Sequence, residues 1–400
     1  MGRKVAIVGG GASGLISSIC AARRGFEVVL YEKSSKIGRK ILATGNGSCN
    51  ISNENISLEN YHGSEPSFIK HALKVFNTDE VKKFFSNIGL EMRKRVDGRL
   101  YPMSLQASCV VEFLLFEAKK LGVDVVVNCE IKDIKKIEDK FKIYFDDKNR
   151  EFDKVIISTG SLAMPTLGSS DSGYRFAKKL GHNSKKTFAS LVQLICNDNS
   201  INNASGVKIV AKLDIFVDKK LKNSVKGDLL FTNYGLSGSA ILDISRSASL
   251  GISDKKEVEI KIDLLPEISL ETLKSLLLKR VKLSQTMPYE LWLNGIIHKK
   301  LIKLILTYAK VGLNINTKTI HKLAFAIKNL NLLIDDTKGV KSCEVMAGGV
   351  LTKDINPKTF ESKIVSGLFF CGEVLDVDGD CGGYNLHFAW ASGYLAGSSL

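Results

Sequence analysis

Proline, histidine and tryptophan are scarce in this sequence, with 6 Pro, 6 His and 2 Trp among 400 residues. No apolar run reaches the roughly 18 residues that a membrane-spanning helix needs. The apolar stretch that begins at Val5 is interrupted by three glycines, so it lacks the continuous apolar core of a secretion signal. With 44% hydrophobic and 25% charged residues, the composition is that of a folded globular protein. We therefore expect a cytoplasmic protein that does not bind membranes.

The residue spacings that mark several common active sites are absent as well. The 8 cysteines are scattered without a Cys-x-x-Cys pair, which disfavours a zinc site and a disulfide framework. The sequence contains no Ser-His-Asp order, no His-x-x-x-His pair and no Gly-x-x-x-x-Gly-Lys-Ser/Thr motif. We therefore expect no metal site, and hydrolase and P-loop chemistry lack support. If the protein is an enzyme, a bound cofactor has to supply the reactive group.

Positive charge is in excess, with 57 Lys and Arg against 42 Asp and Glu and a net charge of +15. Such an excess is compatible with a nucleic-acid partner. The lysines are spread along the chain, however. Their densest groups, at 219–222 and 299–303, have the spacing expected for a hairpin tip and a solvated helix face. We therefore expect no nucleic-acid partner, and a functional basic patch is the alternative.

The first 32 residues have the pattern of a β-α-β unit. The β-branched run at Lys4–Val8 predicts a buried strand, residues 15–24 predict a helix, and Glu27–Tyr31 predicts a second strand. This arrangement is the structural context that a glycine-rich dinucleotide fingerprint requires.

Gly9, Gly11 and Gly14 supply that fingerprint, Gly-x-Gly-x-x-Gly. Its glycines allow a tight turn, a close approach of backbone N–H groups to a pyrophosphate, and close packing of the helix on the strand. Glu32 follows the second strand, where a carboxylate accepts hydrogen bonds from a ribose diol and repels a 2′-phosphate. The pattern predicts a dinucleotide site, and a tight turn without a ligand is the alternative.

The segment from Lys33 to Asn50 is rich in Gly, Ser and Asn. Such a composition is not that of a core helix or a buried strand, and its glycines permit close backbone approach to a ligand. We therefore expect the second half of a long cofactor, FAD, to lie against it.

The pattern Glu-Lys-x-x-x-x-Gly-Arg-Lys-x-x-x-Thr-Gly-Asn-Gly-x-Cys-Asn at residues 32–50 resembles the BaiN/YhiN-type bacterial flavoproteins. These proteins are labelled NAD(P)/FAD-dependent oxidoreductases or aminoacetone-oxidase-family proteins. Segments at 98–104, 231–238, 348–350, 372–376 and 382–385 also match, so the resemblance covers nearly the whole chain. The chain departs from the family pattern at Ser48, Met346 and His387, among others, where the family usually has Arg, Thr and Gln.

The resemblance implies an α/β fold of the glutathione-reductase type. A Rossmann FAD domain at 1–186 and 343–400 would be interrupted at 187–342 by an inserted substrate domain that is β-barrel-like and helical. A chain of 400 residues is also longer than the roughly 250–300 that one hydrophobic core supports. Strict alternation at Val207–Val217 and again at 258–262 predicts strands over 187–265. Helical spacing at 269–283, 288–310 and 317–330 predicts helices over 266–335.

Strand patterns at 124–130, 141–145 and 154–157 predict an antiparallel meander that returns to the parallel sheet. In flavoproteins of this architecture, Thr159-Gly160 resembles the turn that closes this region, and the backbone of Ile131 would read the adenine edge. Ile131 as an ordinary core residue is the alternative. Glu373 stands where such enzymes place an acidic residue on the ribityl chain.

Residues 382–385 open a predicted helix, and its N-terminal N–H groups would point at the flavin N1–C2=O edge and stabilise negative charge there. A plain glycine-rich turn is the alternative. The predicted cofactor-binding residues are Gly9, Gly11, Ala12, Ser13, Gly14, Glu32, Lys33, Arg39, Lys40, Thr44, Gly45, Asn46, Gly47, Asn50, Ile131, Thr159, Gly160, Gly372, Glu373, Asp376, Gly382, Gly383, Tyr384 and Asn385.

The resemblance implies an FAD-dependent oxidoreductase that uses NAD(P)H to reduce a small, apolar substrate such as an enone. There is no second dinucleotide fingerprint, so NAD(P)H would dock transiently near the flavin. Tyr384, His387 and Cys49 are the catalytic candidates, and Tyr384 and His387 carry groups that donate protons; structural roles for all three are the alternative. An oxygen-using amine or aminoketone oxidase, a tRNA-modifying flavoprotein and a non-catalytic flavin-binding module are the other functions that the sequence leaves open.

Overall fold

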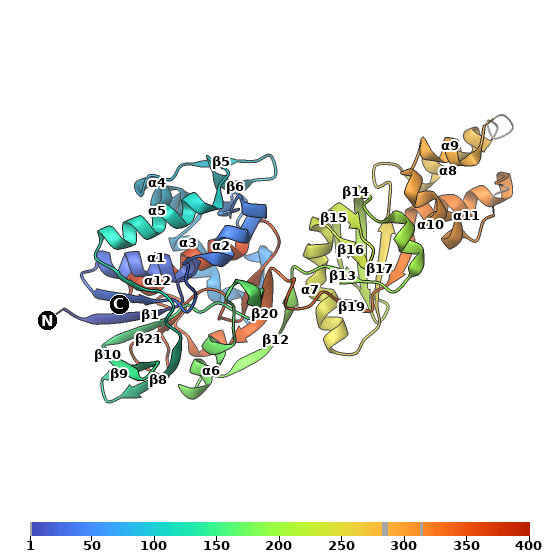
Figure 1. Cartoon of the computed structure of the whole chain (residues 1–400). Coiled ribbons are helices and arrows are strands. Elements are labelled where there is room, and N and C mark those ends of the chain that lie inside the picture. The colour runs from blue at the N-terminus through green and yellow to red at the C-terminus, as the bar shows by residue number, and fades with distance from the viewer. Residues whose placement is uncertain (1, 282–286, 313–314) are drawn as a thin grey trace. The chain divides into compact units, whose positions relative to one another are not determined.

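The computed structural model describes residues 2–281, 287–312 and 315–400, which form two compact units. The first unit comprises Met1–Thr187 and Val345–Leu400, and the second comprises Phe188–Glu344. The units are described separately below (Figure 1).

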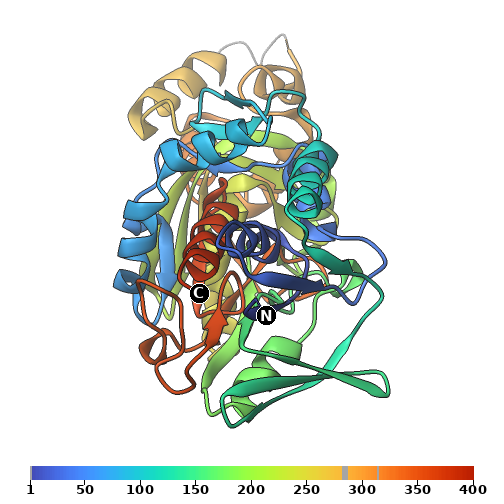
Figure 2. The same ribbon diagram turned by 90° about the vertical axis from the view of Figure 1, so that its left-hand side faces the viewer.

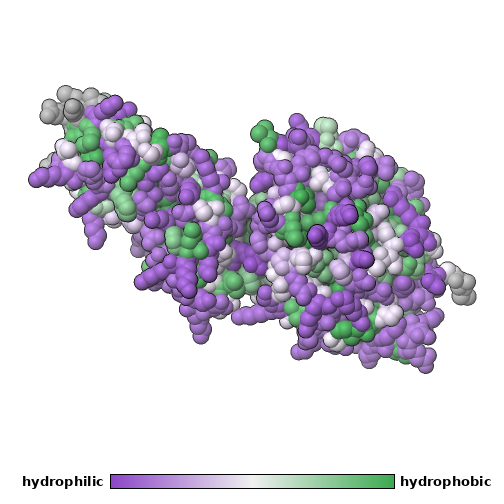
Figure 3. All heavy atoms as spheres, turned by 180° about the vertical axis from the view of Figure 1, so that it is seen from behind, coloured by the Kyte–Doolittle hydropathy of each residue, from purple (hydrophilic) through white to green (hydrophobic). Residues whose placement is uncertain are grey.

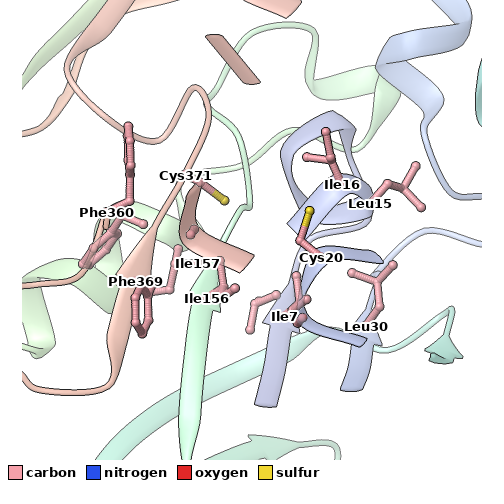
Figure 4. Close-up of a cluster of buried hydrophobic side chains, with 14 of the residues drawn as sticks. Ile7, Leu15, Ile16, Cys20, Leu30, Ile156, Ile157, Phe360, Phe369 and Cys371 are labelled. Atoms are coloured by element: carbon pink, nitrogen blue, oxygen red, sulfur yellow. The ribbon is translucent and has the colours of Figure 1, made fainter. Parts of the chain in front are cut away.

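A five-stranded parallel sheet forms the centre of the first unit, in the order β21-β11-β1-β2-β7. Its strands are β21 (Leu368–Phe370), β11 (Lys154–Ile157), β1 (Lys4–Val8), β2 (Glu27–Tyr31) and β7 (Asp124–Val126). The strands are runs of apolar residues because helices cover both faces of such a sheet. Figure 4 shows side chains of these strands and of the neighbouring helix in one buried cluster, among them Ile7, Leu15, Ile16, Cys20, Leu30, Ile156, Ile157 and Phe369.

Helices α1 (Ala12–Arg23) and α12 (Tyr384–Ser398) lie side by side although they come from opposite ends of the chain (Figure 2). The other helices of the first unit are α2 (Arg39–Ala43), α3 (Lys70–Val75), α4 (Thr78–Asn87), α5 (Ala107–Lys120) and α6 (Ser172–Lys179). The β-α-β unit predicted at the N-terminus and the α/β fold with a parallel sheet are confirmed.

The predicted antiparallel meander is made of β8 (Ile131–Ile137), β9 (Lys140–Phe145) and β10 (Lys148–Phe152). The prediction that residues 124–130 belong to it is wrong. Only Asp124–Val126 is a strand there, and it pairs in parallel with β2 at the edge of the central sheet. Its β-branched residues satisfy the pattern of either kind of sheet, so the sequence alone did not distinguish them.

Three small sheets complete the first unit. They contain β3 (Ser52–Asn53), β6 (Arg99–Pro102) and β5 (Met92–Lys94); β22 (Val377–Gly379) and β4 (Tyr61–Gly63); and β12 (Ser184–Ser190) and β20 (Val345–Val350).

The second unit contains a seven-stranded sheet in the order β18-β17-β14-β15-β16-β13-β19. Its strands are β18 (Leu330–Leu333), β17 (Val258–Asp263), β14 (Lys208–Val217), β15 (Lys220–Phe231), β16 (Gly235–Ser237), β13 (Leu194–Ile195) and β19 (Asp336–Thr337). The alternation predicted at 207–217 is that of β14, whose residues Ala211, Leu213 and Ile215 are fully buried. Helix α7 (Ser239–Ser253) packs on this sheet.

Four α-helices follow among the described residues of the second unit: α8 (Leu270–Val281), α9 (Tyr289–Asn294), α10 (Lys299–Ala309) and α11 (Thr317–Lys328). The prediction of one helix over 288–310 is wrong, since the helix is interrupted between α9 and α10. Gly295 ends α9, and the His298 side chain accepts a hydrogen bond from the N–H of Lys300 to begin α10. The predicted end of the first helix at Leu283 lies outside the described residues. Within the described part of the chain, no helix has the length and apolar character to cross a membrane.

Candidate cofactor site

The turn between β1 and α1 has no room for a side chain at Gly9 and Gly14 of the fingerprint, but it has free space at Gly11. A Cβ atom on Gly9, whose φ is 111°, would lie 2.5 Å from the Ser158 carbonyl oxygen. A Cβ on Gly14 would lie 1.9 Å from the Gly9 oxygen, so neither position accepts a side chain. A Cβ on Gly11 would meet nothing within 4 Å. The turn therefore leaves room for a ligand at Gly11, as the fingerprint predicts for a pyrophosphate.

The N-terminus of α1 has no side-chain cap and no acidic residue in its first turn. The first N–H groups of a helix have no partner within the helix. Those of Ala12 and Ser13 are therefore placed to bind an anion, with the helix dipole adding to the attraction. Ser158 holds the turn from the other side, because its hydroxyl donates to the carbonyl oxygens of Val8 and Gly9 at 3.1 and 2.9 Å.

Glu32 lies at the end of β2 beside this turn. Its carboxylate accepts hydrogen bonds from the N–H groups of Gly10 at 2.9 Å and Ser34 at 2.8 Å. The segment that precedes Ile131 runs alongside, since the N–H of Cys129 donates to the Glu32 carbonyl oxygen at 3.0 Å. The Ile131 side chain is buried in the core, and contact between its backbone and an adenine stays a prediction.

The glycine-rich segment after β2 and the loop before α12 lie against each other. The Asn53 amide donates to the Gly382 carbonyl oxygen at 3.0 Å, and the Trp390 indole donates to the Ile51 oxygen at 3.0 Å. A Cβ on Gly383 would lie 2.9 Å from Asn50 Oδ1. Two stretches from opposite ends of the chain thus form one wall of the first unit.

An ion pair joins the same two stretches further along. Lys40 Nζ lies 2.7 Å from Glu373 Oε2, and Glu373 Oε1 accepts the N–H of Met346 at 3.0 Å. Both side chains of the pair are largely buried, with 29% and 18% of their surface exposed. Lys40 and Glu373 were each predicted to contact the cofactor, and here they also fix each other.

Several of the other predicted cofactor residues have local roles. Arg39 donates to the Thr166 oxygen at 2.9 Å, Thr44 donates to the Ile41 oxygen at 2.7 Å, and the Asn385 side chain hydrogen-bonds both backbone groups of Gly379 at 2.8 Å. Lys33 is half-buried, whereas the backbone of residues 45–47 is exposed and takes left-handed φ values of 57°, 52° and 83°. A Cβ on Gly160 would meet nothing within 4 Å, whereas one on Gly372 would lie 2.5 Å from Ser13 Oγ.

Among the buried polar atoms of this unit that have no hydrogen-bond partner in the described part of the chain, four belong to the candidate site. They are Asn50 Oδ1, Thr159 Oγ1, Tyr174 OH and Asp376 Oδ1. Buried polar atoms are rarely left unsatisfied in folded proteins, so a polar ligand that lies against them would supply what they lack. Together with the open space at Gly11 and the uncapped helix, these atoms fit a large dinucleotide such as FAD.

Two of the catalytic candidates lie in places that disfavour proton or thiolate chemistry. His387 is fully buried, its Nδ1 lies 2.8 Å from Ser52 Oγ, and burial lowers its pKa to about 4. Cys49 is fully buried too, and burial raises its pKa to about 12, so the thiol stays protonated at neutral pH. Tyr384, at the first position of α12, is half-buried, and its carbonyl oxygen accepts the Tyr61 hydroxyl at 3.0 Å. A catalytic role for any of the three stays a prediction.

The structure adds residues that sequence reasoning missed. Ser158, Ser392 and Tyr174 join the site: Ser158 closes the first turn, the Ser392 hydroxyl accepts the N–H of Gly372 at 2.9 Å, and Tyr174 contributes an unsatisfied hydroxyl. Ser158 directly precedes the Thr159-Gly160 turn, which was the one signal for it. Nothing in the sequence pointed to the other two.

The buried histidine predicts a pH dependence of stability that a single substitution removes. Because the pKa of His387 falls from 6.5 in the unfolded chain to about 4 in the folded one, the unfolded state binds more protons between these values. Stability is then complete above pH 6.5 and is lost as the pH falls toward 4, by about 2 kcal/mol at pH 5. In His387→Gln this loss is absent, since glutamine does not titrate.

Urea denaturation of the wild type and the variant at pH 7 and pH 5 measures the difference. The other histidines are common to both proteins, so their contributions cancel in the comparison. Equal losses in the two proteins would show that His387 is protonated as readily in the folded state as in the unfolded one.

Comparisons with known proteins identify the family of the chain. Residues 3–399 match the family described as the HI0933-like protein Rossmann domain. The chain is 36% identical over 401 residues to a 3-dehydro-bile acid delta(4,6)-reductase of Clostridium scindens, covering 98% of both chains. It is 31% identical over 408 residues to a ribosomal RNA dihydrouridine synthase of Haemophilus influenzae, covering 98% of this chain and 97% of the other. The resemblance to BaiN/YhiN-type flavoproteins is thereby confirmed.

A likeness among solved structures supports the fold alone. A 3-ketosteroid delta1-dehydrogenase of Sterolibacterium denitrificans covers the chain with a TM-score of 0.53 at 12% identity, with 99% of each chain aligned. The α/β architecture of the whole chain is therefore one that solved proteins also adopt.

Proposed function

Because the chain belongs to the HI0933-like Rossmann family and is an FAD-dependent oxidoreductase, we propose that it adds hydride, taken from NAD(P)H, to a carbon–carbon double bond conjugated with a carbonyl group. The substrate class is a small, fairly apolar enone. The observation that carries the flavin part is the junction of Asn50 and Gly383, where the two ends of the chain meet at the N-terminus of α12. The reaction class is supported by the name of the bile-acid reductase, at 36% identity over nearly the whole chain.

Bound FAD supplies hydride transfer, which none of the twenty side chains performs. The residues of the chain bind and tune it. The N–H groups at the start of α1 would hold the pyrophosphate, and Glu32 would accept from the adenosine ribose in addition to its two backbone donors. Helix α12 begins at Gly383 without a side-chain cap, so its dipole stabilises negative charge at its N-terminus.

The reduction also needs a proton on the carbon next to the carbonyl, since hydride alone would leave an enolate. Tyr384 is the titratable side chain at the first position of α12, and unlike His387 it is only half-buried. We assign the donation of this proton to Tyr384 or to water that reaches this end of the helix. The role assigned to His387 is to position Ser52. Cys49 takes no part in the proposed reaction.

Anaerobic titration of the purified protein tests the proposal. We expect the visible flavin bands to bleach on addition of NADH or NADPH and to return on addition of a conjugated enone, with one double bond consumed for each nucleotide oxidised. Bleaching by amines alone, with recovery in oxygen, would indicate an oxidase. A protein whose flavin reacts with neither donor would be a flavin-binding module, and either result would overturn the proposal.

A second candidate is the reduction of uridine in ribosomal RNA. Two relatives bear that activity in their names, at 31% and 29% identity over 98% of this chain. The chemistry is of the same class, because the C5=C6 bond of uracil is conjugated with the C4 carbonyl. The net charge of +15 is the observation on this chain that favours it. The test incubates ribosomal RNA with the enzyme and NADPH and follows uridine by mass spectrometry. A loss of uridine with a gain of two hydrogens would support RNA reduction over reduction of a small enone.

A further inference from the structure

The positive charge of the chain is concentrated in one part of the second unit. Residues 266–330 carry 11 Lys and Arg and only 3 Asp and Glu, a net charge of +8 out of +15 for the chain. This segment contains helices α8 to α11, which we call the helical cap. An exposed helix face does not require such an excess of positive over negative charges, because like charges repel one another and destabilise a compact fold.

Most of these cations have no acidic partner. Among the acidic residues of the segment, Glu267 pairs with Lys226 outside it and Glu271 pairs with Lys274. Among the described residues, the helical cap then has eight cationic side chains without an ion pair: Lys279, Arg280, Lys299, Lys300, Lys303, Lys310, Lys318 and Lys322. They are distributed over three helices, so they form a field suited to a partner that carries many negative charges.

Helix α11 places an aromatic ring within this field. Lys318, His321, Lys322 and Phe325 are all exposed. Lys318 precedes His321 and Lys322 by three and four residues, and these precede Phe325 by four and three, so the four side chains lie on one side of the helix. Phe325 is 52% exposed, which costs free energy unless a partner covers it. A flat apolar ring between cations is the arrangement by which proteins stack unpaired bases and neutralise the neighbouring phosphates.

A cleft between α9 and α10 also brings apolar and cationic side chains together, with Glu290 as one acidic lining residue. Its volume is about 840 Å³, and its walls include Leu291, which is 58% exposed, and the apolar side chains of Ile302 and Leu306. Lys299 and Lys303 line it as well. On the face seen in Figure 3, this end of the second unit, next to the grey residues, shows apolar side chains interspersed among hydrophilic ones.

We propose that the helical cap is a docking surface for single-stranded RNA. The cations on α8, α10 and α11 bind phosphates, Phe325 stacks on a base, and the cleft between α9 and α10 receives a second one. A small amphipathic anion would use one lysine and one cleft, and would leave the other cations and Phe325 without a role. The inference deepens the second candidate function, since it names the surface that would hold the RNA.

Fluorescence anisotropy of the full-length protein with a labelled 20-nucleotide single-stranded RNA tests the surface. The test variant is Lys299→Glu/Lys303→Glu/Lys322→Glu. The control is Lys74→Glu/Lys148→Glu/Lys358→Glu, which reverses three exposed lysines of the first unit and changes the net charge equally. We expect the test variant to bind at least thirtyfold more weakly at 0.1 M salt and the control less than threefold. The slope of log affinity against log salt should fall by about 2 in the test variant, since each phosphate contact on a single strand contributes about 0.7.

Phe325→Ala separates stacking from charge. We expect about tenfold weaker binding with an unchanged salt slope, whereas Phe116→Ala, at a ring that is 69% exposed on α5, has no effect. Equal losses in the two triple variants, binding of duplex RNA as tight as that of the single strand, or no RNA binding by the wild type would overturn the proposal. Flavin bleaching by NADPH is expected to be unchanged in the test variant, so a failure of RNA binding is distinguishable from a failure of the proposed reductase.

Discussion

Gly11→Asp is expected to yield a folded protein that no longer retains FAD. A Cβ atom at this position would meet nothing within 4 Å, and the φ of −83° suits any residue, so the backbone and the space at Cβ accept the substitution. Aspartate is moreover one of the best residues to cap a helix N-terminus, whose first N–H groups it accepts from. Glycine is itself tolerated at this position, so the free energy of unfolding of the cofactor-free variant should equal that of the wild type or exceed it by about 0.3 kcal/mol.

The same carboxylate occupies the place of the pyrophosphate and repels it. We expect the affinity for FAD to fall more than a hundredfold, which corresponds to about 3 kcal/mol lost from charge repulsion and from the helix N–H groups that aspartate now occupies. The ratio of flavin to protein absorbance after purification, and fluorescence quenching on addition of FAD, measure this. Gly11→Ala is the control, since it adds the same Cβ without charge. A yellow Gly11→Asp protein would show that the phosphates lie elsewhere.

The part of the site formed by neighbouring residues was predictable from the sequence. Gly9, Gly11 and Gly14 mark a turn whose geometry depends on the adjacent strand and helix. The structure gives Gly9 and Gly14 a steric reason, whereas it leaves free space at Gly11. Glu32 follows the second strand and was predicted for the same reason. Such local patterns are predictable because the strand, the turn and the helix that define them are adjacent in the sequence.

The part formed by distant residues was predictable only through the family resemblance. The composition of residues 50–53 does not indicate that they lie against residues 382–383, because contacts such as the hydrogen bond between Asn53 and Gly382 join positions far apart in the chain. The sequence pattern likewise did not predict which of the candidate side chains are buried. His387 and Cys49 were candidates for catalysis by residue type, yet both are fully buried, and burial shifts the pKa of each away from the range in which it would react.

The break between α9 and α10 shows a different limit. Apolar spacing continues from residue 288 to 310, so periodicity alone predicts one helix. In the structure α9 ends at Gly295, and α10 begins after its N-cap residue His298. Glycine inside a helical pattern is common enough that it does not by itself mark an end.

The packing of α12 on α1 leads to the second large expected effect, which inverts the usual result of replacing glycine in a helix. Gly→Ala inside a helix normally stabilises by roughly 0.5–1 kcal/mol, since alanine loses less backbone freedom on folding. At Gly393 the added Cβ would lie 2.4 Å from the Ser13 carbonyl oxygen and 2.5 Å from the Ile16 side chain. Because the first of these atoms belongs to the backbone of α1, the helices have to move apart.

We therefore expect Gly393→Ala to lower the free energy of unfolding by about 3 kcal/mol, at the upper end of the range for overpacked cores. Urea denaturation of the cofactor-free protein measures the loss. Ser13 also lies in the first turn of α1, so displacement of this helix should weaken FAD binding as well, and the two effects should appear together. Gly11→Ala is again the matched control, with the same atoms added where they meet nothing. A Gly393→Ala protein that is as stable as the wild type would show that α1 and α12 are further apart than this structure places them. The glycine would then serve another purpose than the close approach of the two ends of the chain.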